Sequence, residues 1–205
     1  MNSTAAANTT DTGGLAPPTL LHTDLALDFV AMSPEALPLV AEVEKTAYSH
    51  PWTLRHFQDS LQAGYLMQML VAQPSAVQAG QLPWLGSPTL PDGRHLLGYV
   101  LAMQGVEEVH LLNITTTPAH QRRGWARLMM DALAHWARAQ QAQWLWLEVR
   151  TSNHPARGLY TSLGYRSMGL RKGYYPNGNL PREDALVMAL DLRPADQPRA
   201  PHALS

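Results

Sequence analysis

Cysteine is absent from this chain of 205 residues, and charged residues make up only 15% of it. The first absence excludes thiolate nucleophiles, disulfide bonds and cysteine-based zinc sites, so any catalysis must use oxygen or nitrogen groups. The formal net charge of -1 provides no basic field, which disfavours extended binding to nucleic acid or to anionic membranes. The nine histidines follow no H-E-x-x-H or comparable spacing, and no metal is expected.

Long hydrophobic segments are absent as well. No apolar run reaches the roughly 18 residues that a transmembrane helix needs. The opening segment, MNSTAAANTTDTGGLAPP, has neither a basic region nor an apolar one, and so predicts no secretory signal. These features favour a cytoplasmic protein with no membrane partner, and they favour no particular oligomeric state.

Composition divides the chain into one domain and two tails. Residues 1–24 are rich in Ala, Thr, Asn, Gly and Pro, and bury too little apolar surface to offset the entropy of ordering, so disorder is predicted. Residues 193–205 are rich in Pro, Ala and His, and are predicted to be flexible. The domain between them, residues 25–192, is long enough for one hydrophobic core.

Inside this domain, residues 73–95 have no apolar period and are rich in proline and glycine. They separate two predicted strands, Tyr65–Ala72 and Leu96–Gln104, and are therefore expected to form a long loop inside a hairpin. Trp84 in this loop either covers part of a binding cleft or pins the loop to the body of the domain.

Apolar periodicity predicts the other elements. Helices are expected from Ser33–Pro34 and from Thr53. Beyond residue 109 a strand, a helix with an apolar stripe and the strand WLWLEV follow one another, which predicts a right-handed crossover between parallel strands. Two further strands are predicted at Tyr165–Leu170 and Ala185–Leu192.

The turn that opens the crossover helix is suited to an anion. Its sequence is Gln121-Arg122-Arg123-Gly124-Trp125-Ala126. Glycine and alanine permit backbone N–H groups to approach a phosphate, the helix N-terminus adds positive potential, and two arginines add charge. The motif resembles a pyrophosphate cradle in outline; taken alone, a basic turn before a helix is more often only solvated.

The residues around this turn resemble a known family. Gln121, Gly124 and Ala126 fit the Q/R-x-x-G-x-G/A signature of the GNAT superfamily of N-acetyltransferases. Outside the long loop, the domain is similar to the RimI-type ribosomal-protein-alanine N-acetyltransferases, through PWT, LLNITTTP, QRRGWARLMM, WLWLEVRTSNHPARGLYTSLGY and YYPNGNLPREDALVMAL. One departure is the polar TTT before Pro118, where the family usually has small apolar residues and an aspartate.

The resemblance implies a fold and a cofactor. The fold is α+β: a mixed, mostly antiparallel twisted sheet with helices on both faces and a splayed pair of parallel strands at the cofactor site. Acetyl-CoA would be the acetyl donor, and no metal would be needed. The residues implied in binding it are Ile114, Thr115 and Thr116 for the pantetheine arm and thioester, Arg122, Arg123, Gly124, Trp125, Ala126 and Arg127 for the pyrophosphate, and Asn153 for the cofactor arm.

The resemblance also implies two catalytic residues, Glu148 as general base and Tyr160 as general acid. An α-ammonium, with a pKa of about 7.7–8.0, must lose a proton before it attacks a thioester, and the departing thiolate must gain one. Glu148 lies on the strand face shared by Trp144 and Trp146, where partial desolvation favours proton uptake.

Both residues also have a purely structural interpretation. Glu148 would then be a strand carboxylate paired with Arg150. Tyr160 would be a core tyrosine packed near Leu163 and Ala156.

The acceptor implied by the resemblance is the N-terminal alanine of a small-subunit ribosomal protein. Tyr174, Tyr175 and Pro176, with the Arg182-Glu183-Asp184 cluster, match the hairpin that closes the peptide side in the family. There Glu183 or Asp184 either attracts a basic peptide or is only solvated.

Two alternatives remain from the sequence. The same machinery would serve other protein N-termini, lysine side chains or a small amine. A non-catalytic acyl-CoA-binding or complex-forming module is the other; it needs neither Glu148 nor Tyr160, and the presence of both argues against it.

Overall fold

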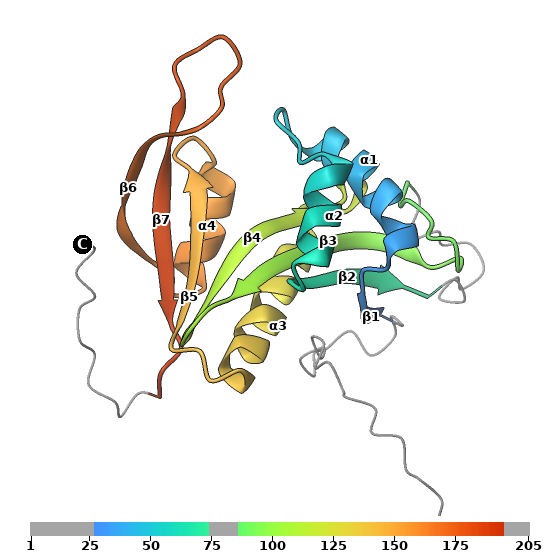
Figure 1. Cartoon of the computed structure of the whole chain (residues 1–205), viewed down its shortest axis with the longest axis horizontal. Helices are drawn as coiled ribbons and strands as arrows, with labels where there is room; N and C mark the ends of the chain where they lie inside the picture. The colour runs from blue at the N-terminus through green and yellow to red at the C-terminus, as the bar shows by residue number, and fades with distance from the viewer. Residues whose placement is uncertain (1–26, 74–85, 195–205) are drawn as a thin grey trace, which may run out of the picture.

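A seven-stranded sheet organises residues 27–73 and 86–194, the part of the chain that the computed structural model describes (Figure 1). The strand order is β1-β2-β3-β4-β5-β7-β6, and only β4 and β5 pair in parallel. The strands are β1 (Leu27–Ala31), β2 (Leu66–Ala72), β3 (His95–Gln104), β4 (Glu108–Thr116), β5 (Trp144–Arg150), β6 (Arg166–Tyr175) and β7 (Glu183–Asp191). The predicted mixed, mostly antiparallel sheet is therefore confirmed.

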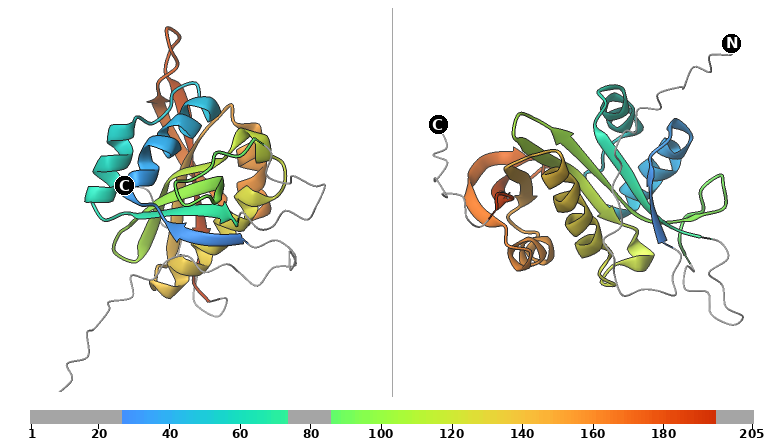
Figure 2. Two further views of the ribbon diagram at one scale, coloured as in Figure 1. Left: turned by 90° about the vertical axis from the view of Figure 1, so that its right-hand side faces the viewer. Right: turned by 90° about the horizontal axis from the view of Figure 1, so that it is seen from below.

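Helices cover both faces of this sheet. In Figure 2, α1 and α2 lie on one side, and α3 and α4 lie on the other. The helices are α1 (Leu37–Ala47), α2 (Leu54–Gln62), α3 (Trp125–Ala139) and α4 (His154–Ser162), with short 3-10 turns η1 (Pro34–Ala36) and η2 (Pro118–His120). None of the helices in the described ranges is long and apolar enough to cross a membrane.

The apolar stripe of α3 explains why it covers one face. Met129 and Leu133 on α3 are fully buried in one cluster with Leu145 and Leu147, which alternate with less buried residues along β5. A second cluster on the opposite face packs α1 and α2 against β2 and β3. The crossover helix predicted between two parallel strands is thus confirmed, with β4 before α3 and β5 after it.

The sheet opens between β4 and β5. The two strands pair only from Glu108–Leu111 on β4 with Trp144–Leu147 on β5. Farther along, β4 remains paired with β3, across a register shift between Leu101 and Ala102, while β5 remains paired with β7. The predicted splay is confirmed, and it exposes the edges of both strands at their carboxyl ends.

Several predicted boundaries differ from the structure. Strand β1 was not predicted, and β6 continues beyond Leu170 to Tyr175 because its pairing with β7 resumes after a register shift. Residues 1–24, most of the C-terminal tail and Trp84 lie outside the described ranges. Residues 86–95 of the predicted loop are described: Leu90 is buried, and its N–H donates to the Arg94 carbonyl at 2.8 Å.

Candidate active site

Two clefts meet where β4 and β5 diverge. The α3 cleft, of about 530 Å³, is lined by the end of β4, by the turn before α3 and by α4. The hairpin cleft, of about 600 Å³, is lined by the end of α1 and the segment after it, by β4 and β5, and by the start of the β6–β7 hairpin. Four residues line both clefts and so mark their junction: Tyr48, Ile114, Asn153 and Tyr160.

The turn before α3 has the geometry of an anion cradle. Arg122 and Gly124 both have positive φ angles, of 64° and 89°, so the chain reverses sharply before the helix starts at Trp125. The first N–H groups of a helix have no partner within it, and they carry the positive end of the helix dipole. Because this end of α3 lines the cleft, the cleft suits a phosphate group.

The structure brings together nearly all the residues predicted to hold the cofactor. The exception is Arg123, which does not line the α3 cleft. The predicted residues that line it are Ile114, Thr115, Thr116, Arg122, Gly124, Trp125, Ala126, Arg127 and Asn153. The side chains of Trp125 and Thr115 are buried, so these two residues offer the cleft mainly their backbone.

Two of these residues also make contacts that the sequence did not predict. The Asn153 side chain caps α4 and accepts a hydrogen bond from the Ala156 N–H at 3.2 Å. The Ile114 carbonyl accepts a hydrogen bond from the Tyr48 hydroxyl at 2.8 Å. The junction is thus braced from α4 on one side and from the end of α1 on the other.

Glu148 lies on β5 and lines the hairpin cleft with its side chain 18% exposed. Its carboxylate pairs with Arg171 of β6, at 3.0 Å. The predicted alternative pairing with Arg150 is wrong, because Arg150 pairs with Glu183 at 3.0 Å and lies over the ring of Tyr175. The side chain of Arg150 points toward the hairpin, a direction that strand alternation alone does not determine.

Tyr160 lies on α4 and is 6% exposed, with its ring packed against Tyr165. Its hydroxyl makes no hydrogen bond with the described residues, although the side chain lines both clefts. Burial raises the pKa of Tyr160 well above its ordinary value, and Tyr48 and Tyr175 add to the rise. Tyr160 is therefore protonated at neutral pH, as a proton donor must be.

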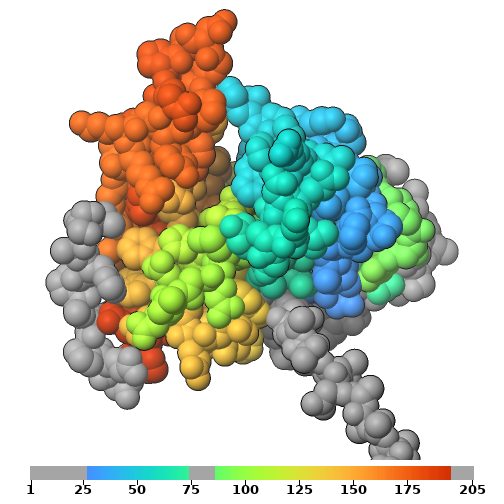
Figure 3. All heavy atoms as spheres, viewed as in Figure 1, coloured from blue at the N-terminus to red at the C-terminus, as the bar shows by residue number. Residues whose placement is uncertain are grey.

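The start of the β6–β7 hairpin is tied to β5. The Tyr175 hydroxyl donates to the Glu148 carbonyl at 3.0 Å, and Arg150 donates to the Pro176 carbonyl at 3.0 Å. In Figure 3, the orange β6–β7 part and the cyan segment after α1 stand on two sides of an opening. Across it, the Gly178 N–H donates to His50 Nε2 at 3.0 Å.

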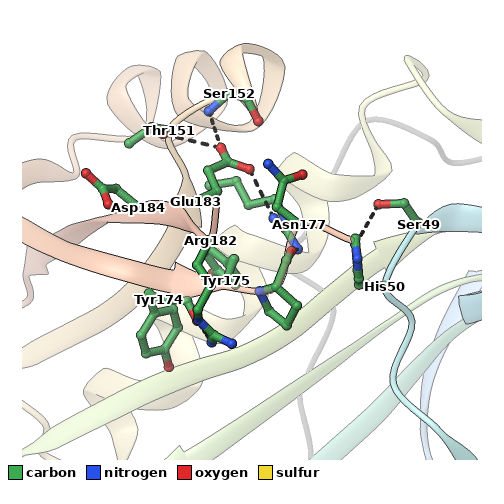
Figure 4. A network of polar contacts seen from close by, with 12 residues as sticks. Ser49, His50, Thr151, Ser152, Tyr174, Tyr175, Asn177, Arg182, Glu183 and Asp184 are labelled. Atoms are coloured by element: carbon green, nitrogen blue, oxygen red, sulfur yellow. Dashed lines mark hydrogen bonds and ion pairs between the residues drawn. The ribbon is translucent and has the colours of Figure 1, made fainter. Parts of the chain in front are cut away.

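Glu183 and Asp184, at the start of β7, are held by hydrogen bonds within the protein (Figure 4). Glu183 accepts hydrogen bonds from the Ser152 N–H at 2.8 Å and from the Thr151 hydroxyl at 3.2 Å. Hydrogen bonds from Ser152, with those from Arg150 and Thr151, lower the pKa of Glu183 to about 2. Asp184 accepts from the Gly173 N–H at 2.7 Å. The Glu183 carboxylate thus fixes the hairpin to the β5–α4 turn, and the Asp184 carboxylate ties β7 to β6 within the hairpin.

One wall of the hairpin cleft was not predicted from the sequence. It comes from α1, the segment that follows and the first turn of α2, through Glu44, Tyr48, His50, Trp52 and His56. The available signal was the aromatic and polar run YSHPWT between two predicted helices. Within the described ranges, no group of three His, Asp or Glu side chains is placed to hold a metal ion.

Known proteins match this chain over most of its length. A model of the acetyltransferase (GNAT) family matches residues 39–165. The (ribosomal protein bS18)-alanine N-acetyltransferases of Haemophilus ducreyi and Escherichia coli K12 are each 30% identical, over 74% and 76% of this chain and 90% and 91% of theirs. The crystal structure of the ribosomal-protein-S18-alanine N-acetyltransferase from Escherichia coli has a TM-score of 0.66 and 28% identity, covering 85% of this chain and 99% of that one.

Proposed function

The chain belongs to the acetyltransferase (GNAT) family, whose acyl donor is acetyl-CoA, and on this premise we propose that it acetylates the N-terminal alanine of ribosomal protein bS18. The acceptor is the one printed in the names of relatives that are 30% identical over about three quarters of the chain. A ribosomal acceptor would place the reaction in the cytoplasm.

The observation that carries this proposal is the junction of the two clefts. The α3 cleft suits a phosphate-bearing cofactor, and the hairpin cleft is separate from it except at Tyr48, Ile114, Asn153 and Tyr160. A thioester laid through one cleft and an amine laid through the other would therefore meet at these four residues. Holding two reactants in this way can lower the activation barrier by about 7–11 kcal/mol.

The residues at the cofactor side have distinct tasks in this proposal. The N-terminus of α3, with Arg122 and Arg127, would hold the pyrophosphate. The backbone of Ile114 to Thr116 would hold the pantetheine arm. Arg127 donates to the Ser162 hydroxyl at 2.6 Å and would exchange this hydrogen bond for a phosphate oxygen.

Proton transfer would be divided between the two clefts. Glu148 would accept a proton from the α-ammonium, and the neutral amine would attack the carbonyl carbon of the thioester as the C–S bond breaks. Tyr160 would donate its proton to the departing sulfur, and the surplus proton on the attacking nitrogen would then restore the Tyr160 hydroxyl. Each proton transfer would raise the reaction rate by a factor of about 10²–10⁴.

The experiment is CoA release with matched peptides that begin with Ala, Ser, Met or Leu, and with one N-terminally blocked peptide that contains lysine. We expect the highest kcat/KM for the alanine peptide, and a loss of about 10²–10⁴ in Glu148→Gln. The matched control is Glu108→Gln, on the same face of the sheet but outside both clefts, which should remain within about twofold. Equal release with the blocked lysine peptide would contradict an N-terminal acceptor.

A further inference from the structure

The charges that line the hairpin cleft are unequally compensated. Apart from histidines, the charged side chains that line this cleft are those of Glu44, Glu148 and Arg150. Glu148 pairs with Arg171, and Arg150 pairs with Glu183. Among the residues that the structure describes, no Lys, Arg or His nitrogen forms an ion pair with Glu44. The cleft therefore carries one carboxylate without a cationic partner.

The two histidines of the cleft do not compensate this charge. His50 accepts a hydrogen bond from the Gly178 N–H through Nε2. His56 accepts one from the Thr53 N–H through Nδ1, at 2.9 Å. A ring nitrogen that accepts a hydrogen bond carries no proton, and the neutral ring satisfies both contacts.

Glu44 is only 2% exposed, yet it is fully hydrogen bonded. One carboxylate oxygen accepts from the Trp52 N–H at 3.2 Å and from the Asn113 amide at 3.0 Å. The other accepts from the Tyr99 hydroxyl and from the Thr115 hydroxyl, which lies at 3.2 Å. Four donors directed at two oxygens are the surroundings of an ionised carboxylate, which can only accept. Hydrogen bonds stabilise this charge without cancelling its field.

The field of Glu44 reaches the junction of the clefts. Burial raises the pKa of the Tyr48 hydroxyl, and the charge of Glu44 adds to the rise. Tyr48 lines both clefts, and its hydroxyl lies 3.1 Å from the Thr115 hydroxyl, the same group that bonds Glu44. The negative charge therefore acts on a side chain that lines the junction, where the acceptor's nitrogen would arrive.

We propose that Glu44 is the buried counter-charge that selects a protonated α-ammonium on the acceptor peptide. Glu44 draws the charged N-terminus to the floor of the hairpin cleft, where Glu148 then takes the proton. Glu148 cannot provide this attraction by itself, because Arg171 already balances its charge at 3.0 Å. The inference rests on the proposed function and assigns a residue that recognises the acceptor's charge.

A thermodynamic cycle that varies both Glu44 and the ammonium of the peptide separates this role from a structural one. We measure by calorimetry, at pH 6.5 and with CoA bound, the Kd of the alanine peptide and of an analogue in which a propanoyl group replaces the alanine. The analogue keeps the shape of the peptide and lacks only the ammonium. In the wild type the charged peptide should bind more tightly than the analogue, and Glu44→Gln should reduce this ratio about tenfold, or about 1.4 kcal/mol.

Two further variants control the cycle. Thr115→Val removes one hydrogen bond to Glu44 but no charge, so it should change both Kd values together and keep their ratio. The double variant Glu148→Gln/Arg171→Gln removes both members of a balanced ion pair, leaves the net charge of the cleft unchanged, and should keep at least half of the wild-type ratio. If Glu44→Gln does not fold, this last measurement decides, because a ratio near one in the double variant would overturn the role of Glu44.

Equal weakening of both peptides in Glu44→Gln, or an unchanged ratio, would also overturn it. CoA release by the wild type with the alanine peptide is measured on the same preparation. Failure of the wild type to release CoA would overturn the acceptor assignment, whereas normal release with an unchanged ratio overturns the role of Glu44 alone.

Discussion

The α3 cleft and the hairpin cleft are built in different ways. The α3 cleft takes nearly all its lining from two stretches, residues 114–127 and 153–160, and offers backbone groups and a helix N-terminus. The hairpin cleft combines side chains from four distant segments, at residues 44–56, 111–114, 148–160 and 175–176. A backbone cradle depends on a short motif, whereas a side-chain cleft depends on the whole fold.

The two clefts also differ in charge. Arg122, Arg127 and the N-terminus of α3 make the first one positive, which suits a pyrophosphate. In the second, Glu44 leaves a negative charge after the other ion pairs are balanced. Ligands of opposite charge are thus sorted to opposite sides of one opening in the sheet.

The largest effect should come from the junction itself. Tyr160→Phe removes the proposed proton donor at the meeting point of both clefts, so kcat should fall about 10²–10⁴-fold. The Kd of acetyl-CoA should remain within about twofold, because the α3 cleft keeps its backbone cradle. Rapid-quench turnover and calorimetry measure the two quantities.

Tyr165→Phe is the matched control for this variant. Tyr165 packs against Tyr160, is buried, and lies outside both clefts. Its hydroxyl has no hydrogen-bond partner among the described residues, so its removal should leave kcat within about twofold. Near-normal kcat in Tyr160→Phe would remove Tyr160 from the mechanism and leave the junction without a proton donor.

A smaller effect should be confined to the α3 cleft. Gly124 has a φ angle of 89°, and alanine in this region costs about 1–2 kcal/mol. A turn that relaxes to avoid this cost misdirects the N–H groups of α3, so Gly124→Ala should weaken acetyl-CoA binding about tenfold. Affinity for the peptide should not change.

Gly158→Ala provides the comparison, since Gly158 lies within α4 and an added Cβ there meets nothing within 4 Å. We expect unchanged binding and a gain of up to about 1 kcal/mol in the free energy of unfolding. Equal losses of acetyl-CoA and peptide affinity in Gly124→Ala would show that the two clefts are not independent.

Sequence reasoning succeeded where the site is local. Gln121 to Ala126 predicted a turn before a helix, and the strand-helix-strand order predicted that this helix joins two parallel strands, as α3 joins β4 and β5. Alternation along β5 placed Glu148 opposite the buried Leu147. These inferences need only short-range periodicity and capping chemistry.

The same reasoning failed where distant segments meet. The partner of Glu148 is Arg171, because β6 continues past Leu170 and returns along β7 over a register shift. The contact of His50 with Gly178 joins residues far apart in the chain. No local pattern encodes such pairs, so the charge balance of the hairpin cleft became visible only in the structure.

Arg171→Gln tests that charge balance at the hairpin cleft. Arg171 holds the Glu148 carboxylate at 3.0 Å, so its removal frees the proposed base to turn away from the acceptor. The value of kcat/KM should therefore fall about tenfold across the whole pH profile, with recovery in Arg171→Lys. An unchanged kcat/KM in Arg171→Gln would show that Glu148 needs no partner to keep its place in the cleft.

The smallest expected effect is the absence of an alkaline limb in the same profile. An ordinary tyrosine loses its proton near pH 10, but burial raises the pKa of Tyr160 above that value. The donor is thus still protonated at pH 10, while the acceptor amine is already neutral above about pH 9. We expect kcat/KM to stay level from about pH 9 to 10 in the wild type.

Stability must be followed by circular dichroism over the same range. A raised pKa in the folded state stabilises the fold fully below about pH 10, the unfolded value, and this contribution is lost only at higher pH. A decline in kcat/KM below pH 10, with the fold intact and with no such decline in Tyr160→Phe, would contradict the assignment. It would mean that Tyr160 titrates as an exposed tyrosine does, and that the junction of the clefts is open to water.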